Sequence, residues 1–350
     1  MILNERQKQI IAAQESKIVV EACPACGKTA VLIERIRFLV DSGVTPEGIV
    51  AITFTNTAAN EIKERLGEKA NGVFIGTIHG YANFLLYSND INTLPILKLK
   101  DFDKLFDLVE QNPDCVPTID HLLLDEAQDS TKNQYHFLFN VLHPRNFFLV
   151  GDPRQAIFVW ADADPEFFLN LMDSPEVTTY HLNQNYRNAR NIASFAKSLI
   201  LLAGYRYQDN STPMREEKGR VINATASISS ICRALRDDND YKNWFVLCRT
   251  NQELNIMLRE FEMRDIPFDV IKRSELPKEE MLRILQKDSI KLMTIHAAKG
   301  LESQKVMVIG AKFYNIEEIC TSYVAATRAR DLLVWVQNPK RGRKKVQSWE

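Results

Sequence analysis

The chain has 350 residues, of which 45% are hydrophobic and 25% are charged, and its formal net charge is −1. This composition excludes a disordered or fibrous protein, and it is enough for two hydrophobic cores of roughly 150 residues each. No apolar stretch reaches the ~18 residues of a membrane span, and the N-terminus carries charged residues in place of a signal sequence, so we expect a cytoplasmic protein with no membrane partner.

The first predicted elements are a buried strand over residues 17–22 and a helix over 28–40, joined by a short loop. Backbone N–H groups of such a loop, together with the helix N-terminus, bind phosphate oxygens. Gly27 allows a close approach, Lys28 reaches the outer phosphates, and the Thr29 hydroxyl binds magnesium. The predicted ATP-binding residues of the loop are Ala22, Cys23, Pro24, Ala25, Cys26, Gly27, Lys28 and Thr29. An ordinary strand-to-helix turn is the alternative, because the usual small loop residues are replaced.

A second apolar strand is predicted over residues 119–124, and Asp125 falls at its C-terminal end, where open α/β sheets bind ligands. Asp125 is predicted to hold Mg²⁺, directly or through water. Glu126 is predicted to orient and deprotonate an attacking water molecule. The alternative is a solvated acidic cap on the following helix, formed by Asp125, Glu126 and Asp129. Together with the phosphate loop, these carboxylates predict an ATPase.

Seven further segments extend this pattern along nearly the whole chain. They are residues 3–7, 51–62, 76–80, 150–160, 182–187, 291–302 and 323–330. In content and order the chain resembles the UvrD/Rep-like superfamily 1 DNA helicases. The resemblance implies an α/β fold of two tandem RecA-like lobes, ATP and Mg²⁺ as cofactors, and single-stranded DNA or a 3′-tailed duplex as partner.

The resemblance also implies roles around the nucleotide. Gln7 presents an amide to the adenine base, and Tyr186 stacks on it. Glu302 hydrogen-bonds the ribose, and Gln155 senses the γ-phosphate. The implied catalytic residues are Lys28, Glu126, Gln155, Arg187 and Arg328.

Arg187 and Arg328 are the cations that the second lobe supplies to the γ-phosphate, where an arginine finger is worth about a thousandfold or more in rate. Position alone favours a simpler interpretation for Arg328, an exposed helix arginine beside Arg330. For Tyr186, the alternative to stacking on adenine is a half-buried core tyrosine with a paired hydroxyl.

For DNA, the resemblance points to three aromatic side chains and to polar residues near strand ends. The implied DNA-binding residues are Phe54, Thr55, Asn56, Thr77, His79, Phe158, Trp160, Thr294 and His296. Bases stacked on aromatic rings contribute roughly 1 to 3 kcal/mol each with little sequence preference, which suits a translocating motor. The alternatives are core aromatic residues, above all for Phe54, and structural histidines.

Two lobes are expected, an N-terminal ATP-binding lobe at residues 1–180 with a minimal insertion near 85–118, and a C-terminal lobe at 181–350. Predicted strands lie near 17–22, 49–54, 73–76, 119–124, 147–151 and 177–181 in the first lobe, and near 219–223, 244–249, 268–271, 290–294, 305–309 and 332–336 in the second. Because strands alternate with helices, mainly parallel sheets covered on both faces are predicted.

Charge is distributed unequally between the two halves. Residues 1–180 contain 15 Lys and Arg against 25 Asp and Glu, a balance of −10, whereas residues 181–350 contain 29 against 20, a balance of +9. The run 340–345 has five cations in six positions. Such a tail attracts nucleic-acid phosphates, unless it only increases solubility.

Short gaps between motifs bear on activity. Only 45 residues separate His79 from Asp125, and 106 separate Arg187 from Thr294, where larger relatives insert accessory subdomains. We therefore expect a DNA-stimulated ATPase that translocates 3′ to 5′ and unwinds duplexes weakly by itself. Trp160 is followed by Ala161 where the family has arginine, and Glu302 by Ser303 where an aromatic is expected, so coupling of ATP to DNA is altered.

Three other functions compete with this prediction. A nucleotide-gated subunit would control a partner such as a nuclease with little translocation. An RNA-directed helicase is opposed by the resemblance alone. A small-molecule kinase leaves the second-lobe arginines unexplained.

Of the six cysteines, only Cys23 and Cys26 are close in sequence. A lone Cys-x-x-Cys lacks the second ligand pair of a structural zinc site, so zinc is not expected. The position of Cys26 near a helix N-terminus is expected to lower the pKa of its thiol, and a disulfide with Cys23 would distort the phosphate loop. One hypothesis is therefore a redox-sensitive ATPase. The other is that both are small loop-filling residues in a reduced protein.

Overall fold

The computed structural model describes residues 3–272, 278–336 and 347–348. The chain divides into two compact units, Met1–Asn183 and Gln184–Glu350. The division lies three residues after the expected boundary at 180/181, because the last strand of the first sheet ends at Leu182. Each unit is described by itself.

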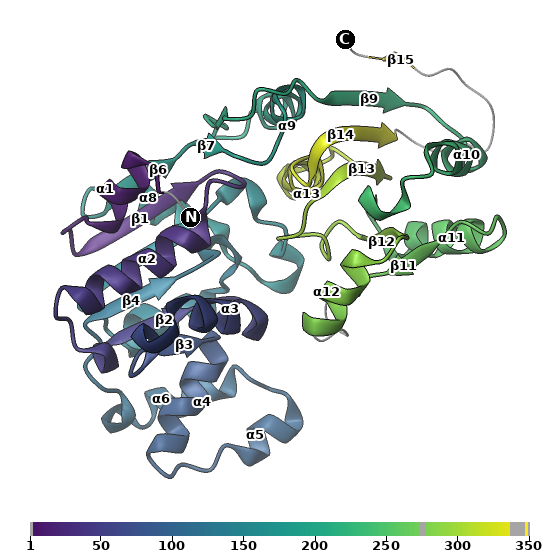
Figure 1. The fold of residues 1–350 in the computed structure, drawn as a ribbon. Helices are drawn as coiled ribbons and strands as arrows, with labels where there is room; N and C mark the ends of the chain where they lie inside the picture. The colour runs from purple at the N-terminus through teal and green to yellow at the C-terminus, as the bar shows by residue number, and fades with distance from the viewer. Residues whose placement is uncertain (1–2, 273–277, 337–346, 349–350) are drawn as a thin grey trace. The chain divides into compact units, whose positions relative to one another are not determined.

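Unit 1 is built on a six-stranded sheet in the order β3-β2-β4-β5-β1-β6, and every pairing in it is parallel (Figure 1). The strands are β1 Lys17–Ala22, β2 Ile49–Ile52, β3 Phe74–Gly76, β4 His121–Leu124, β5 Asn146–Gly151 and β6 Thr178–Leu182. All but the edge strands are almost entirely buried, as parallel strands covered on both faces must be. The strands predicted for this half are present within three residues.

Helices cover both faces of this sheet. They are α1 Glu5–Ile11, α2 Lys28–Asp41, α3 Asn56–Leu66, α4 Ile78–Ser88, α5 Leu94–Leu99, α6 Lys104–Glu110, α7 Lys132–His136 and α8 Pro165–Met172. One core joins α1, α2 and α3 to residues such as Val20, and the other joins α4, α6, α7 and α8 to residues such as Val19. Adjacent strand residues thus enter opposite cores, as the strand period of two requires.

The segment 85–118, where a minimal insertion is expected, contains the end of α4 together with α5 and α6. These three helices, which we call the helical patch, form the lower end of unit 1 in Figure 1. Helices α4 and α6 pack on each other.

Unit 2 has a seven-stranded sheet in the order β11-β12-β10-β13-β14-β9-β15, parallel except for the antiparallel pairing of β15 with β9. The strands are β9 Arg220–Ala224, β10 Trp244–Cys248, β11 Phe268–Val270, β12 Ile290–Thr294, β13 Ser303–Ile309, β14 Ala329–Val336 and β15 Gln347–Ser348. A separate two-stranded pairing joins β7 Gln184–Asn185 to β8 Thr212–Pro213. The strands predicted for this half are also confirmed, again with mainly parallel order.

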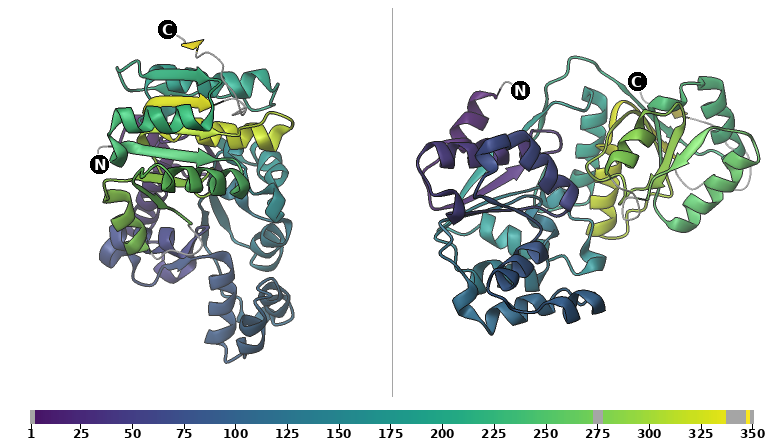
Figure 2. Two further views of the ribbon diagram at one scale, coloured as in Figure 1. Left: turned by 90° about the vertical axis from the view of Figure 1, so that its right-hand side faces the viewer. Right: turned by 60° about the horizontal axis from the view of Figure 1, so that its bottom comes forward.

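The helices of unit 2 lie on both faces of its sheet (Figure 2). They are α9 Arg190–Leu202, α10 Ile228–Asp238, α11 Asn251–Glu262, α12 Lys278–Gln286 and α13 Ile316–Ala326. Val336 belongs to the core formed with α10 and α11, whereas its neighbour Trp335 contacts Phe195 of α9. The predicted basic tail at 340–345 lies outside the described residues. Within the part of the chain that is described, no helix is long and apolar enough to cross a membrane.

Candidate active site

The predicted phosphate loop connects β1 to α2 at the carboxyl edge of the unit 1 sheet. Ala25 and Gly27 have left-handed backbone conformations, with φ of 57° and 86°. Alternation of right- and left-handed residues gathers successive N–H groups into a concavity that binds anions. A side chain at position 27 would also place its Cβ 2.8 Å from Gln7 Nε2. Glycine is therefore required at this position both for its φ and for the close approach of Gln7.

Gln7 is buried in α1 and reaches the loop directly. Its amide Nε2 donates to the carbonyl of Cys26 at 2.9 Å, while its Oε1 accepts from Asn4 N–H in a capping box. The end of α1 is held in turn by Arg35 of α2, whose Nη1 donates to Ile11 O and Ala13 O at 2.6 Å each. Gln7 thus fixes the last turn of the loop, and reading of adenine by this residue stays a prediction.

Thr29 and Asp125, the predicted magnesium ligands, lie side by side. Asp125 directly follows β4, and its Oδ2 accepts from the Thr29 hydroxyl at 3.3 Å. Burial, and then the adjacent Glu126, raises the pKa of Asp125 to about 6, although Lys28 and the Thr29 hydroxyl oppose this rise. Hydroxyl and carboxylate oxygens are the hard ligands that Mg²⁺ prefers. The donor set therefore fits a magnesium ion.

Lys28 and Glu126 form an ion pair across the same edge, with Nζ and Oε1 3.3 Å apart. Burial disfavours the charged ammonium of Lys28, but Glu126 and then Asp152 outweigh it and raise its pKa. Glu126 is itself held in a left-handed conformation, with φ of 52°. Its carboxylate lies beside the ammonium group of Lys28, the residue predicted to bind phosphate.

The alternative of a solvated acidic cap is wrong. Asp125 and Asp129 are only 5% and 3% exposed. The following helix, α7, is capped by Thr131, whose hydroxyl accepts from Gln134 N–H at 3.2 Å. Glu126 makes no side-chain capping bond to the short turn that follows it.

Gln128, a residue that sequence reasoning missed, connects two parts of this site. It is fully buried, its Nε2 donates to Glu126 Oε2 at 2.7 Å, and its Oε1 accepts from the Asp152 N–H at 2.9 Å. Asp152 Oδ2 accepts from Gln155 Nε2 at 2.7 Å. Gln155, predicted to sense the γ-phosphate, is therefore held in the same hydrogen-bonded network as the predicted base. The only sequence signal for Gln128 was its place two residues after Glu126.

The three predicted DNA-stacking aromatics come together in unit 1. Phe54 follows β2 and stacks on Phe158, with ring centroids 5.4 Å apart and planes 18° apart. Trp160 lies 6.3 Å from Phe158 in a tilted arrangement. Phe54 is 50% exposed and Trp160 is 67% exposed, so the alternative that they are core residues is wrong.

The polar residues predicted to contact DNA begin the helices that follow β2 and β3. Thr55 caps α3 by accepting from Ala58 N–H at 3.2 Å, and Thr77 caps α4 by accepting from Gly80 N–H at 3.1 Å. Asn56 is the exposed first residue of α3. The N-termini of α3 and α4 each carry a partial positive charge. Helix α3 follows β2, the strand that precedes Phe54, and α4 follows the neighbouring strand β3.

His79, by contrast, has structural partners. Its Nε2 lies 2.9 Å from Asp103 Oδ1, and its ring stacks on Phe106 at 4.8 Å. Phe106 lies in the first turn of α6 in the helical patch, and Asp103 directly precedes that helix. The structural interpretation of this histidine fits its surroundings, and its contact with DNA stays a prediction.

In unit 2, Glu302 lies between two arginines. Arg187 Nε donates to Glu302 Oε2, and Arg330 Nη1 donates to Oε1 at 2.8 Å. Burial disfavours the ionised carboxylate, but Arg187 and Arg330 outweigh it and lower the pKa of Glu302. Arg330, the last residue of the motif 323–330 and one without a predicted role, is thus part of this cluster.

Arg328 differs from its simpler interpretation, whereas Tyr186 does not. Arg328 is only 2% exposed, and its guanidinium donates to Val324 O at 2.9 Å and to Leu301 O at 3.4 Å, so it is not an exposed helix arginine. Tyr186 is 44% exposed and its hydroxyl donates to Gln184 Oε1 at 2.5 Å, which is compatible with the alternative of a half-buried tyrosine with a paired hydroxyl. Contact of either residue with a nucleotide stays a prediction.

The remaining predicted positions lie at or beside the site motifs. Thr294 ends β12 and accepts from Ala297 N–H at 3.3 Å, and His296 follows it half-buried. Cys23 and Cys26 are unpaired and 1% exposed. A hydrogen bond with Cys26, and then burial, raises the pKa of Cys23, which opposes thiolate formation at this loop position.

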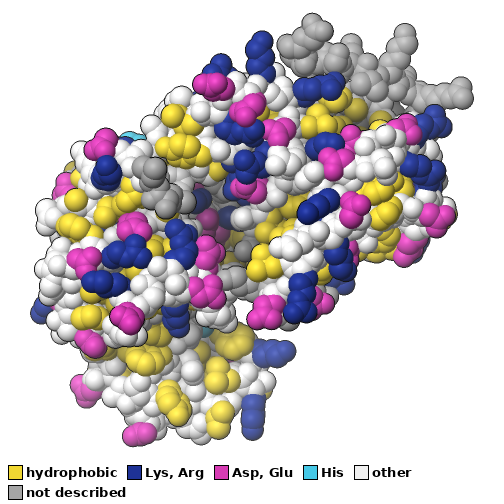
Figure 3. Space-filling view, in the orientation of Figure 1, with side chains coloured by type: hydrophobic (Ala, Val, Ile, Leu, Met, Phe, Trp, Pro, Cys, Tyr) yellow, Lys and Arg dark blue, Asp and Glu magenta, His cyan; other side chains and the backbone are white. Residues whose placement is uncertain are grey.

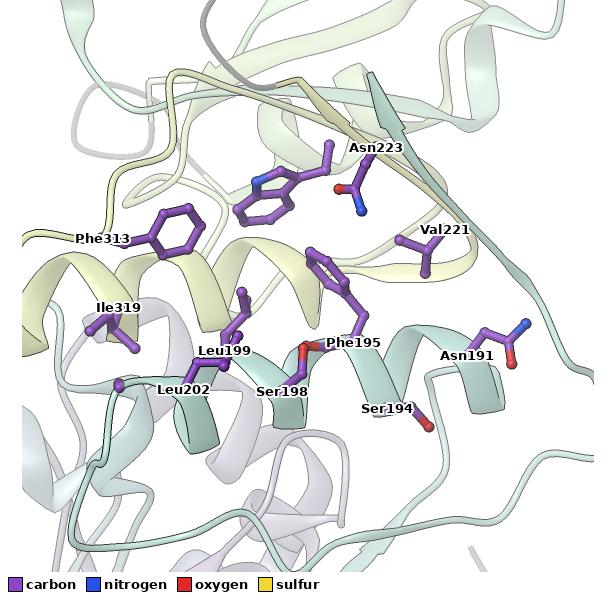
Figure 4. Close-up of a pocket in the computed structure, with 12 residues that line it drawn as sticks. Asn191, Ser194, Phe195, Ser198, Leu199, Leu202, Val221, Asn223, Phe313 and Ile319 are labelled. Carbon is purple, nitrogen blue, oxygen red and sulfur yellow. The ribbon is translucent and has the colours of Figure 1, made fainter. Parts of the chain in front are cut away.

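A separate apolar pocket of about 720 Å³ lies within unit 2, between α9 and the strands β9 and β14 (Figure 4). Phe195, Phe313 and Trp335 form its aromatic walls, and Asn191 and Asn223 bring amides to it. The described residues that line it include none of those that the motifs single out.

Comparison with known proteins agrees with this arrangement. Residues 3–114 and 90–176 match the model of the UvrD/REP helicase N-terminal domain, and residues 268–338 match that of the UvrD-like helicase C-terminal domain. The chain is 26% identical over 340 residues to the Gabija protein GajB of Bacillus cereus, covering 81% of this chain and 67% of that protein.

Two helicases are similarly related. A probable DNA helicase of Mycoplasma pneumoniae is 25% identical over 458 residues, covering 95% of this chain and 83% of the relative. The ATP-dependent DNA helicase PcrA of Staphylococcus epidermidis is 24% identical over 369 residues, covering 77% and 51%. The chain therefore spans about half to four-fifths of the length of these relatives.

Proposed function

Because the chain belongs to the UvrD-like DNA helicase family, we propose that it is an ATP-driven motor that moves 3′ to 5′ along single-stranded DNA. The observation that carries the proposal is the convergence of Lys28, Thr29, Asp125 and Glu126 at one sheet edge. We place the motor in the cytoplasm, because Cys23, Cys26, Cys115, Cys232 and Cys248 are buried thiols outside any disulfide, as is typical of a reducing compartment.

The chain's own residues have defined tasks in this proposal. Lys28 and the loop N–H groups hold the β- and γ-phosphates, and Thr29 with Asp125 holds Mg²⁺, which when bound neutralises phosphate charge. Glu126 accepts the proton of the attacking water, and Gln128 keeps its carboxylate in one orientation through the 2.7 Å hydrogen bond. Arg187 and Arg328 of unit 2 supply positive charge to the γ-phosphate.

The DNA strand is proposed to lie on Phe54, Phe158 and Trp160. Two of these rings are at least half exposed, and Phe54 stacks on Phe158 with ring centroids 5.4 Å apart. Base stacking on such rings carries little sequence preference, as a motor requires. Since the helical patch is the small insertion of unit 1, we propose that duplex unwinding by the chain alone is weak.

A titration of ATP hydrolysis with poly-dT tests the motor. We expect hydrolysis to rise strongly with DNA in the wild type, and to fall by about a thousandfold in Glu126→Gln while ATP binding is kept. Hydrolysis that ignores poly-dT contradicts the motor. A strand-displacement assay on 3′- and 5′-tailed duplexes tests polarity, and robust unwinding by the lone chain contradicts the last part of the proposal.

A second candidate function is a nucleotide-gated subunit that controls a partner protein such as a nuclease. The observation that favours it is the apolar surface of the helical patch, which Figure 3 shows at the lower end of the molecule. Phe84, Tyr87, Leu94 and Leu99 there are 48% to 76% exposed. Hydrolysis that responds to a co-purified protein and not to poly-dT favours this function.

A further inference from the structure

A row of charged side chains crosses the interior of unit 1 from β5 through β1 to β6. Arg154, just after β5, is 1% exposed, and its Nε donates to Asp152 Oδ1 at 2.7 Å. Its Nη2 lies 3.3 Å from Glu21 Oε1 on β1. The other oxygen of Glu21 lies 2.6 Å from Nδ1 of His181 on β6. Four titratable groups are thus joined in series across three neighbouring strands.

Strand pairing places these groups together. Glu21 is in register with Gly151 on one side and with His181 on the other. Residues in register on neighbouring parallel strands share a face, so Gly151, Glu21 and His181 form one row across the sheet. Asp152 and Arg154 follow Gly151 at the end of β5. Glu21 is 8% exposed and sits in a strand that is otherwise apolar from Ile18 to Ala22. Such a buried carboxylate is costly unless it is paired.

One end of the row reaches the predicted catalytic groups. Asp152 accepts from Arg154 with one oxygen and from Gln155 with the other. The N–H of Asp152 donates to Gln128, which holds Glu126. The orientation of Arg154 therefore bears on both the predicted base and the predicted phosphate sensor through unbroken hydrogen bonds.

The other end reaches the point where the chain leaves unit 1. His181 is the penultimate residue of β6, and unit 2 begins at Gln184. The next carbonyl, that of Leu182, accepts from the N–H of Cys23 in the phosphate loop at 3.0 Å. The last two residues of β6, next to the connecting chain, are thus bonded to Glu21 and to the phosphate loop.

We propose that Glu21, Arg154 and His181 are positioning residues that connect the exit of unit 1 to Glu126 and Gln155. This inference rests on the proposed ATPase and concerns its regulation. In it, the row keeps Asp152 and Gln128 in the orientation that hydrolysis needs. None of the three residues contacts phosphate in the proposal, so they act on the rate of hydrolysis and not on ATP binding.

The test uses the full chain and two substitutions of the half-exposed His181, which leave no unpaired buried charge of their own. His181→Leu removes the bond to Glu21, whereas His181→Asn offers an amide N–H at the position of Nδ1. We expect kcat of DNA-stimulated hydrolysis to fall about tenfold in His181→Leu, a loss of one charge-assisted hydrogen bond, and to recover to within about twofold in His181→Asn. The Kd for ATP stays at the wild-type value in both.

Glu21→Gln is the second variant, with a larger expected fall in kcat because Arg154 loses one of its charged partners and keeps Asp152. Glu176→Gln is the matched control, since Glu176 pairs with Lys17 at the exposed opposite end of the same strands. It leaves kcat unchanged. Circular dichroism melting, recorded for every variant, separates positioning from unfolding.

Two results overturn the inference alone. One is wild-type kcat in folded His181→Leu and Glu21→Gln. The other is a fall of kcat that follows the unfolded fraction and that His181→Asn does not restore. Absence of hydrolysis in the wild-type chain overturns the proposed function and the positioning role together.

Discussion

Gly151, the last residue of β5, is predicted to be intolerant of even one added methyl group. A Cβ at this position would lie 2.7 Å from Gln128 Oε1 and 2.8 Å from the Phe168 ring. Both neighbours are fully buried, so neither has free space to move into. Gly151→Ala therefore acts by displacing Gln128 and not by restricting the backbone.

The expected cost has two parts. Overpacking of a core by a methyl group costs about 1 to 3 kcal/mol. Loss of the Gln128 bond to the Glu126 carboxylate adds about 1.5 to 3 kcal/mol if it breaks fully. Taking about 3 kcal/mol in all, and a unit of this size, the melting temperature falls by about 6 to 12 °C.

Differential scanning calorimetry of the full chain measures this fall, and a double-mutant cycle with Gln128→Ala identifies its cause. If Gln128 is the displaced group, the double variant is less destabilised than the two single variants together. Additive effects, or a Gly151→Ala variant that melts within about 1 °C of the wild type, refute the steric reasoning.

Three further outcomes are expected. Asp125→Asn raises the melting temperature at pH 8, because the folded chain holds the Asp125 proton up to a pKa of about 6 while the unfolded chain releases it near 3.8. Stability from this group therefore falls as pH rises through that window, and the gain, on the order of 2 kcal/mol, disappears below pH 4 in a pH series of melting curves. Phe54→Ala and Trp160→Ala each weaken binding of a dT oligonucleotide by about 5- to 100-fold in fluorescence anisotropy, without changing the Kd for ATP. Treatment with the oxidant diamide leaves the rate of ATP hydrolysis equal to that of the untreated, reduced protein, since the thiols of Cys23 and Cys26 are buried. Inactivation that dithiothreitol reverses would restore the redox hypothesis.

Much of the fold follows from local patterns in the chain. Continuous apolar runs such as 18–20 and 122–124 predict buried parallel strands, and the structure has them. The strand, loop and helix around Gly27 were likewise predictable, because glycine adopts the left-handed conformation there without strain. Local patterns do not determine which strands become neighbours, although the α/β alternation limits the choices.

The side-chain network around the site was less predictable, because it depends on pairing between distant strands. Gln128 meets Asp152 only because β4 and β5 are neighbours, and Glu21 meets His181 only through the pairing of β1 with β6. Isolated from these partners, Glu21 is an unexplained charge in an apolar strand. Arg328 shows the same limit, since its burial depends on carbonyl groups from two separate segments.

The position of β1 between β5 and β6 has a consequence for synthesis of the protein. This strand leaves the ribosome first, yet its two neighbours end at Gly151 and Leu182. A nascent β1 therefore lacks its second neighbour, β6, until roughly 160 further residues have been synthesised, which takes about 8 to 30 seconds at ordinary translation rates. During that interval an unpaired strand edge is open to aggregation, so slow translation of the first unit calls for chaperone protection.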